Sequence, residues 1–345
     1  MNYLSRKSNI ELLRLFCIFG ILVMHILGRS MNNLSFANRE IDLLFNSFFN
    51  CGVTIFILIS GYFGIHFSWK KIFKLHTMVL VYSIIYTLVS ILPTGLAIQD
   101  VFITLFPILS NRFWFMTSYF ILCFLSPYIN KFINMVNKKE CLSLTFTLLF
   151  FFSIIPTVTN LDFTFDNGKG IVNMILIYII GRCIKLGYIH LSKKQSVILG
   201  LASVLITFVL MSFISYFQDK VVLGYFFNDY SILVIVSSVC IFNIFRSFDI
   251  TSPYINRLSK HVLAVYILEW PVMDLIDKFI NLNDFGQSPC FFLVFFAYAF
   301  LVFASCILVD EVRVLLFDKL EDKVIDKIIA TLKLQNSAKV WIKFI

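Results

Sequence analysis

Charged residues are scarce in this chain: Asp, Glu, Lys and Arg make up 14% of its 345 residues, whereas 59% are hydrophobic. A soluble domain carries about 25% charged residues, so this composition excludes an ordinary soluble protein. Glycine (13) and proline (7) are also few, and we find no low-complexity linker and no internal repeat. We therefore expect a polytopic membrane protein without a separate soluble domain of ordinary size.

Metal-binding patterns are absent as well. The eight cysteines are dispersed, and none forms a CxxC or another spacing typical of a metal site. Most of them lie in apolar runs, where cysteine behaves as a small hydrophobic residue. We predict no metal and no bound cofactor. The first apolar run has no small-x-small cleavage pattern after it, so we interpret it as a retained span.

Long apolar runs are what the chain does have. An α-helix needs about 20 apolar residues to cross a bilayer core of about 30 Å. Runs of this kind, the fifth of them shorter, predict an all-α integral-membrane fold of about ten transmembrane helices. They cover residues 10–28, 43–64, 72–93, 113–135, 141–156, 171–189, 196–217, 230–246, 259–280 and 289–312. Between the third and fourth, Val101 to Leu109 is predicted to be interfacial or re-entrant.

The net charge of +9 follows from topology rather than from a nucleic-acid partner. Cytoplasmic segments of membrane proteins are enriched in Lys and Arg. If both termini are cytoplasmic, the outer loops hold only a few of the 29 basic residues, namely Arg29, Arg39, Arg112, Lys169, Lys220 and Lys278. Apolar residues at helical spacing after Asp310 predict an amphipathic helix on the inner leaflet. We expect a membrane domain of residues 1–312 and a cytoplasmic amphipathic tail of residues 313–345.

The first apolar run carries three groups that a lipid-facing helix should not contain: Glu11, Arg14 and His25. Arg14 and His25 are eleven residues apart, which is three helical turns plus about 20°, so they share a face about 16 Å apart along the axis. Glu11 is on the same face and is positioned to pair with Arg14. Because ionisable residues inside spans mark function by default, this helix is a candidate site.

Two other spans carry polar groups. Asn46, Asn50 and Thr54 recur every four residues in the second span, which indicates either helix packing or a wet cavity facing the first span. Glu269 stands in the middle of the ninth span. Buried there, a carboxylate needs a cation or several donors, or a raised pKa.

Five segments in order along the chain resemble the acyltransferase 3 family of integral-membrane acyltransferases, which modify bacterial surface carbohydrates. They are RLFCIFGILVMH, VTIFILISGYFG, FWFMTSYFILCFLSPYIN, IYIIGRCIK and SKHVLAVYILEWPV. The resemblance implies substrate or donor contacts at Ser60, Trp114, Tyr119 and Tyr266. Two departures stand out: Lys70, Lys71 and Lys74 replace an Arg pair that the family often has, and Glu269 stands where many relatives have histidine. Lysine attracts phosphate but lacks the bidentate fork of arginine.

The resemblance implies transfer of an acyl group, with acetyl expected, from cytoplasmic acyl-CoA to a hydroxyl of a cell-surface glycan, an exopolysaccharide or a precursor. His25 would be the general base, and Glu269 would orient or tune a histidine. The CoA phosphates would meet Arg14 and the three lysines, while Asn46, Asn50 and Ser60 would hydrogen-bond a substrate. Expected partners are the donor, the glycan, the bilayer of a bacterial plasma membrane and the polysaccharide biosynthesis machinery.

Two other classes of membrane protein would also fit part of this pattern. The membrane-bound O-acyltransferases expect an essential histidine in a late span, where this chain offers only His261, at the start of the ninth stretch. A glycan or lipid transporter or flippase would also carry intramembrane charge. The scarcity of Gly- or Pro-interrupted spans and of inverted repeats argues against transport.

Overall fold

The structure is a computed structural model that describes residues 7–30, 34–332 and 334. Within these ranges all regular structure is helical and no strand is found, which confirms the predicted all-α class. The α-helices are α1 (Ser8–Ser30), α2 (Phe36–Phe49), α3 (Gly52–Phe63), α4 (Trp69–Tyr86), α5 (Ile98–Leu105), α6 (Trp114–Met135), α7 (Lys138–Leu149), α8 (Ile155–Thr159), α9 (Ile171–Lys185), α10 (Lys193–Gln218), α11 (Ile232–Arg246), α12 (Pro253–Leu258), α13 (Val262–Ile276) and α14 (Phe291–Thr331). Short π and 3-10 segments are η2 (Thr87–Ile91), η3 (Leu92–Thr94), η4 (Phe150–Ile154), η5 (Tyr225–Phe227), η6 (Ser259–His261) and η7 (Leu282–Phe285).

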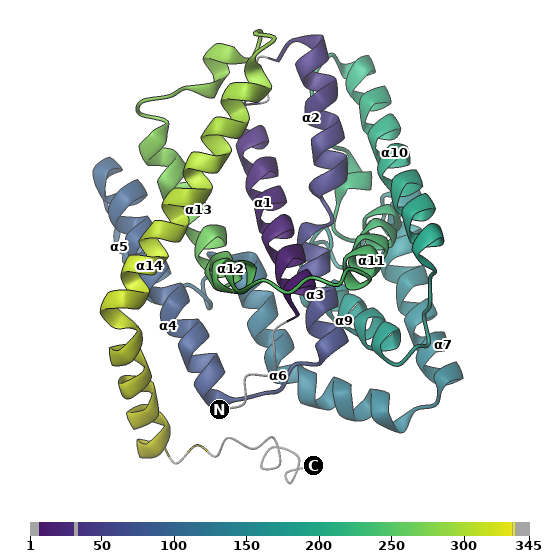
Figure 1. The fold of residues 1–345 in the computed structure, drawn as a ribbon, viewed down its shortest axis with the longest axis horizontal. Helices are drawn as coiled ribbons and strands as arrows, with labels where there is room; N and C mark the ends of the chain where they lie inside the picture. The colour runs from purple at the N-terminus through teal and green to yellow at the C-terminus, as the bar shows by residue number, and fades with distance from the viewer. Residues whose placement is uncertain (1–6, 31–33, 333, 335–345) are drawn as a thin grey trace.

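The helices form a bundle with α1 in its middle, flanked by α5 and α14 on one side and by α10 on the other (Figure 1). In the described part of the chain, seven helical stretches are long and apolar enough to cross a membrane. They are Ser8–Ser30, Phe36–Phe63, Trp69–Thr94, Lys138–Thr159, Lys193–Gln218, Tyr225–Arg246 and Phe291–Thr331. The chain is therefore a multi-pass membrane protein.

The other three predicted spans also form helices, α6, α9 and α13. Helices α9 and α13 have only 15 residues each, fewer than the roughly 20 that a full span needs. Helix α6 has 22 residues but contains Asn130 and Lys131. The count of ten spans and the cytoplasmic side of the termini stay predictions.

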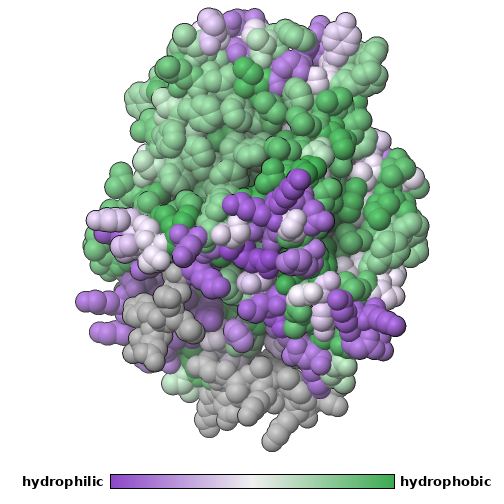
Figure 2. Space-filling model, turned by 45° about the vertical axis from the view of Figure 1, so that its right-hand side comes forward, coloured by the Kyte–Doolittle hydropathy of each residue, from purple (hydrophilic) through white to green (hydrophobic). Residues whose placement is uncertain are grey.

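Apolar residues cover much of one face of the bundle. Figure 2 shows a broad hydrophobic band over the upper part of the face in view, with hydrophilic residues gathered below it and a thin group above. Helix α10 contributes to the exposed apolar surface with Leu201 (57% exposed), Val209 (59%) and Phe213 (63%). Apolar surface on this scale is unfavourable in water and is expected of a protein whose sides face lipid.

The sequence predicts one continuous helix for the second span, and this prediction is wrong. The span breaks into α2 and α3 at a turn over Asn50 and Cys51. Asn50 caps α2, and its side chain donates to the carbonyl of Phe227 at 2.5 Å. The break occurs where an asparagine side chain can replace helical hydrogen bonds with a tertiary one.

Helix α14 continues without interruption from the last predicted span into the predicted tail. Its 41 residues rise about 60 Å, about twice the thickness of a bilayer core. The lower part flanks the start of α4 (Figure 1), where Lys70 pairs with Asp326 at 2.7 Å and Lys74 pairs with Asp318 at 2.7 Å. The remainder of the predicted tail, residues 333 and 335–345, lies outside the described residues.

Helices α3 and α9 approach each other through glycines. A Cβ atom at Gly61 would lie 2.2 Å from the carbonyl oxygen of Tyr178, and one at Gly181 would lie 2.5 Å from the carbonyl oxygen of Leu58. Small residues permit such close helix packing inside membranes. The two family-like segments that contain these glycines are thus a mutual packing surface.

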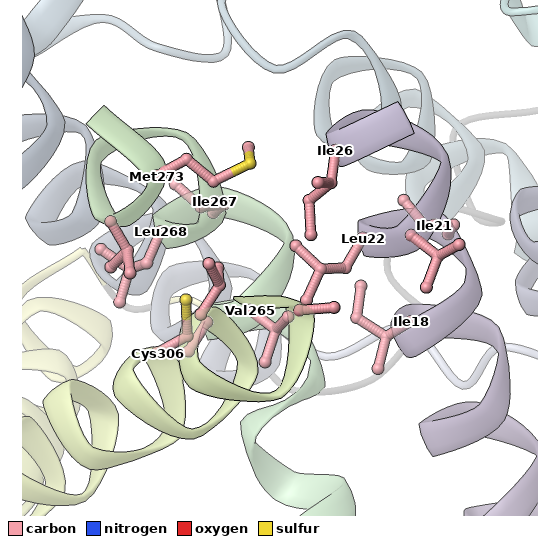
Figure 3. Close-up of a cluster of buried hydrophobic side chains, with 14 of the residues drawn as sticks. Ile18, Ile21, Leu22, Ile26, Val265, Ile267, Leu268, Met273 and Cys306 are labelled. Atoms are coloured by element: carbon pink, nitrogen blue, oxygen red, sulfur yellow. The ribbon is translucent and has the colours of Figure 1, made fainter. Parts of the chain in front are cut away.

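A second packing surface joins α1 to α13 and α14. Figure 3 shows Leu22 and Ile26 of α1 directed toward Val265 and Ile267 of α13, with Cys306 of α14 beside them. All five side chains are at most 1% exposed. This apolar contact fixes the register between α1 and α13, the two helices that carry His25 and Glu269.

Candidate functional site

His25 and Glu269 are in direct contact. Nδ1 of His25 hydrogen-bonds Oε1 of Glu269, although the residues are 244 positions apart in the chain. The Glu269 side chain is fully buried, whereas that of His25 is 34% exposed. Oε2 of Glu269 has no hydrogen-bond partner among the residues that the structure describes. Since Glu269 holds Nδ1, Nε2 is the ring nitrogen left for a substrate.

An ion-pair cluster locks the same two helices close to this pair. Arg29, one turn beyond His25 on α1, pairs with Asp274 and Asp277 near the end of α13, both at 2.8 Å. Its guanidinium also lies 4.7 Å from the ring centroid of Trp270, and the Trp270 ring lies 5.5 Å from that of His25. Two charge-assisted pairs from one planar group give strong geometric constraint. They hold α1 and α13 together at the end where His25 and Glu269 meet.

His25 opens into a cavity of about 460 Å³, which we call the His25 cavity. Pockets of roughly 300 to 1,000 Å³ accommodate small-molecule ligands. Aromatic rings dominate its wall, interrupted by three groups that carry or can carry charge. The lining residues are His25, Tyr86, Ile91, Asp100, Ile103, Arg112, Phe113, Trp114, Tyr266 and Trp270.

Arg14 lines a different cavity of about 380 Å³, the Arg14 cavity. Arg14 Nη1 lies 3.5 Å from Oε1 of Glu11, and Lys260 supplies a second cation to the wall. Ser60 and Tyr119 bring hydroxyls that lie 3.5 Å apart. Most of the remaining lining is apolar: Ile18, Ile21, Val53, Phe56, Leu75, Phe115, Met116, Val262, Leu263 and Tyr266, together with Ser259.

Tyr266 belongs to the walls of both cavities. The adjacent residues Trp114 and Phe115 divide in the same way, Trp114 lining the His25 cavity and Phe115 the Arg14 cavity. The Phe115 and Tyr266 rings pack edge to face with centroids 5.7 Å apart. The two cavities are therefore neighbours separated by aromatic side chains of α6 and α13.

The fold brings most of the predicted site residues to these cavities. Arg14, Ser60, Tyr119 and Tyr266 line the Arg14 cavity, with Glu11 beside Arg14. His25, Trp114 and Tyr266 line the His25 cavity, with Glu269 behind His25.

Besides Glu11 and Glu269, five predicted residues line neither cavity: Asn46, Asn50, Lys70, Lys71 and Lys74. Asn46 is buried and donates to the backbone and side chain of Asp42, while Asn50 contacts the carbonyl of Phe227. The contact of Asn50 with a distant segment favours packing over a wet cavity, whereas both contacts of Asn46 stay within α2. Lys70 and Lys74 pair with acidic residues of α14, and Lys71 is exposed.

Sequence reasoning missed five polar or aromatic residues of the His25 cavity: Tyr86, Asp100, Arg112, Phe113 and Trp270. From the sequence, Arg112 is assigned only to an outer loop. Its position two residues before Trp114, a predicted site residue, could have indicated that it belongs to the same site. Trp270 directly follows Glu269 and was equally accessible. Tyr86 and Asp100 could not be found, since only tertiary packing brings α4 and α5 to His25. No group of three or more His, Cys, Asp or Glu residues in the described ranges could hold a metal ion.

Comparison with known protein families matches most of the chain. The sequence model of a family described as an acyltransferase domain matches residues 7–311, which include both cavities and every residue named at the two of them. No curated protein and no solved structure matches the chain.

Proposed function

The chain belongs to the acyltransferase 3 family of membrane acyltransferases, and we propose that it moves an acyl group, acetyl by family analogy, from cytoplasmic acyl-CoA to a hydroxyl of a cell-surface glycan, an exopolysaccharide or a precursor. The observation that supports this best is the carboxylate-backed histidine in a cavity beside a second, cationic cavity. The distribution of Lys and Arg supports an orientation in which the Arg14 end faces the cytoplasm.

His25 acts as general base in this proposal. A hydroxyl is a weak nucleophile at neutral pH, and a positioned base contributes about 10²- to 10⁴-fold to such a reaction. Nε2 takes the hydroxyl proton as the oxygen attacks the thioester carbonyl carbon. The carbon–sulfur bond then breaks, and the imidazolium gives its proton to the departing sulfur, so that free CoA leaves as a thiol. Glu269 holds Nδ1, orients the ring and stabilises its cationic form, as carboxylates do in hydrolase triads.

The Arg14 cavity serves the donor. Arg14 and Lys260 offer positive charge to phosphate groups, and the apolar lining suits the pantetheine arm. Arg14 and His25 are about 16 Å apart along α1, so the arm must pass Tyr266 to bring its thioester to His25. Ser60 and Tyr119 are placed to hydrogen-bond the arm. Lys71 would attract the donor from the cytoplasm, and Lys70 and Lys74 would do so once released from the acidic residues of α14 that pair with them.

The test uses purified protein in detergent with acetyl-CoA and a panel of sugar acceptors. Thiol release and sugar mass are followed together. His25→Ala should lower both signals at least about 100-fold, while His190→Ala, an exposed histidine outside both cavities, should leave them unchanged. Undiminished transfer in His25→Ala would exclude His25 as the base. Passage of unmodified glycan across a vesicle membrane without thiol release would instead identify the protein as a transporter.

A further inference from the structure

Arg112 is the one arginine of the His25 cavity wall, and its guanidinium is firmly held. It comes from the segment between α5 and α6. Nη1 donates to Ser83 Oγ at 3.0 Å, to Thr87 Oγ1 at 2.9 Å and to Thr104 Oγ1 at 3.2 Å. The guanidinium carbon lies 4.4 Å from the ring centroid of Tyr86. Hydroxyls of three elements and an aromatic ring thus fix the group in one orientation.

The other end of the same guanidinium is unsatisfied. Nη2 is buried and has no hydrogen-bond partner among the described residues. Its fixed neighbours are neutral hydroxyls, and no carboxylate forms an ion pair with Arg112 in the part of the chain that the structure describes. Burying a cationic donor without a partner is unfavourable, so a fixed guanidinium with a vacant donor is ready for an oxyanion.

The acidic groups near the cavity do not fill this position. Asp100 is in the wall, but its Oδ2 accepts the backbone N–H of Ala97 at 2.9 Å at the start of α5. Glu269 is engaged with His25. A further cation stands at the edge, since Nζ of Lys169 lies 5.5 Å from the ring centroid of Trp114. Arg112 therefore lines a pocket beside which Glu269 and Oδ2 of Asp100 are engaged by other groups.

The rest of the wall suits a sugar ring. Tyr86, Trp114, Tyr266 and Trp270 offer flat faces and polar tips, and the volume of about 460 Å³ is in the range of small-ligand pockets. We propose that the His25 cavity binds an acceptor sugar that carries an anionic group, with the Arg112 guanidinium pairing with the anion and a ring hydroxyl at His25. The anion is a carboxylate on the ring or a phosphate attached to it. This inference rests on the proposed function, because it assigns the acceptor to that cavity.

Binding without donor tests the inference. Trp114 and Trp270 line the cavity and are two of only four tryptophans, so tryptophan fluorescence reports occupancy in the full-length protein. The probes are methyl glucoside, methyl glucuronide and glucose 1-phosphate. We expect at least one anionic probe to bind about tenfold more tightly than the neutral glucoside, as one charge-assisted hydrogen bond allows. The anionic probe that binds more tightly shows whether the anion is a ring carboxylate or an attached phosphate.

Variants distinguish a specific contact with Arg112 from a general effect of positive charge on the protein. Arg112→Gln should abolish the preference for the anionic probe, and Arg112→Lys should keep part of it, because lysine retains the charge but not the fork. Arg39→Gln is the matched control, since Arg39 pairs with Glu40 and Asp219 and lines neither cavity. Equal binding of all three probes, no binding of any of them, or an unchanged preference in a folded Arg112→Gln protein would overturn the inference. Acyl transfer to a neutral sugar by the same preparation would leave the proposed function intact.

Discussion

Replacing Glu269 with Gln tests the histidine–carboxylate pair most directly. The substitution keeps the shape of the side chain and removes only its charge. Glu269 is fully buried and contacts Nδ1 of His25, so the amide loses the stabilisation of an imidazolium and permits the wrong tautomer of the ring. The equivalent change in a hydrolase triad lowers kcat about 10⁴-fold. We expect a loss of about 10²- to 10⁴-fold here, or about 3 to 5 kcal/mol in the activation free energy.

The loss should appear in kcat rather than in the KM for acetyl-CoA, because Glu269 lines neither cavity and acts through His25. The fold should survive. Oε2 of Glu269 has no hydrogen-bond partner among the described residues, and glutamine keeps the size of the side chain while removing a buried charge that is costly to desolvate. The melting temperature of Glu269→Gln should therefore equal or exceed that of the unmodified protein.

The assay is steady-state thiol release with a saturating sugar acceptor, at matched detergent and lipid. Asp249→Asn, an exposed acid of the loop after α11, is the control and should keep full activity. A Glu269→Gln enzyme with normal kcat would refute the role of the carboxylate. So would a defect confined to the KM for the donor.

Three further outcomes follow from the packing and the charges. Tyr266→Ala should raise acceptor-independent thiol release several-fold, because it enlarges the opening between the two cavities; an unchanged rate would show that the acyl group takes another route. Gly61→Ala should destabilise the protein by about 1 to 3 kcal/mol, since its Cβ would meet the α9 backbone, whereas Gly28→Ala has no atom within 4 Å and should melt normally. The double variant Asp318→Asn with Asp322→Asn frees the lysine of α4 that both acids bind and should lower the KM for acetyl-CoA about two- to tenfold, measured at low salt where exposed pairs are least screened.

The sequence was most informative where a residue type was costly in its surroundings. His25 and Glu269 were both singled out because ionisable groups are expensive inside spans, and the structure joins them. The shared helical face of Arg14 and His25 followed from the periodicity alone. What periodicity could not give is that the two residues open into different cavities, because the aromatic wall between them comes from α6 and α13.

Other features depend on tertiary contacts. In the sequence, Asn50 looks like one more position of a polar stripe. An asparagine that ends a helix cannot be told from one that packs a helix by residue type and spacing alone. Lys70 and Lys74 looked like free phosphate-attracting groups, since nothing local revealed that α14 extends far enough to pair with them. Arg112 was assigned to topology because its hydroxyl partners lie on α4, η2 and α5. Local composition indicates such residues, and only packing assigns their partners.

Tyr266 has a consequence for the permeability of the membrane. Two cavities that hold charged groups on either side of one side chain shorten the path that a proton or a small ion would have to cross. A membrane enzyme must not dissipate the membrane potential, which drives each elementary charge with about 2.3 kcal/mol per 100 mV. The aromatic ring shared by the two cavities is an insulator as well as a partition. In the proposed mechanism its size is set by two opposing demands, passage of an acyl group and retention of the ion gradient. A bulkier or smaller residue at this position would then satisfy one at the expense of the other.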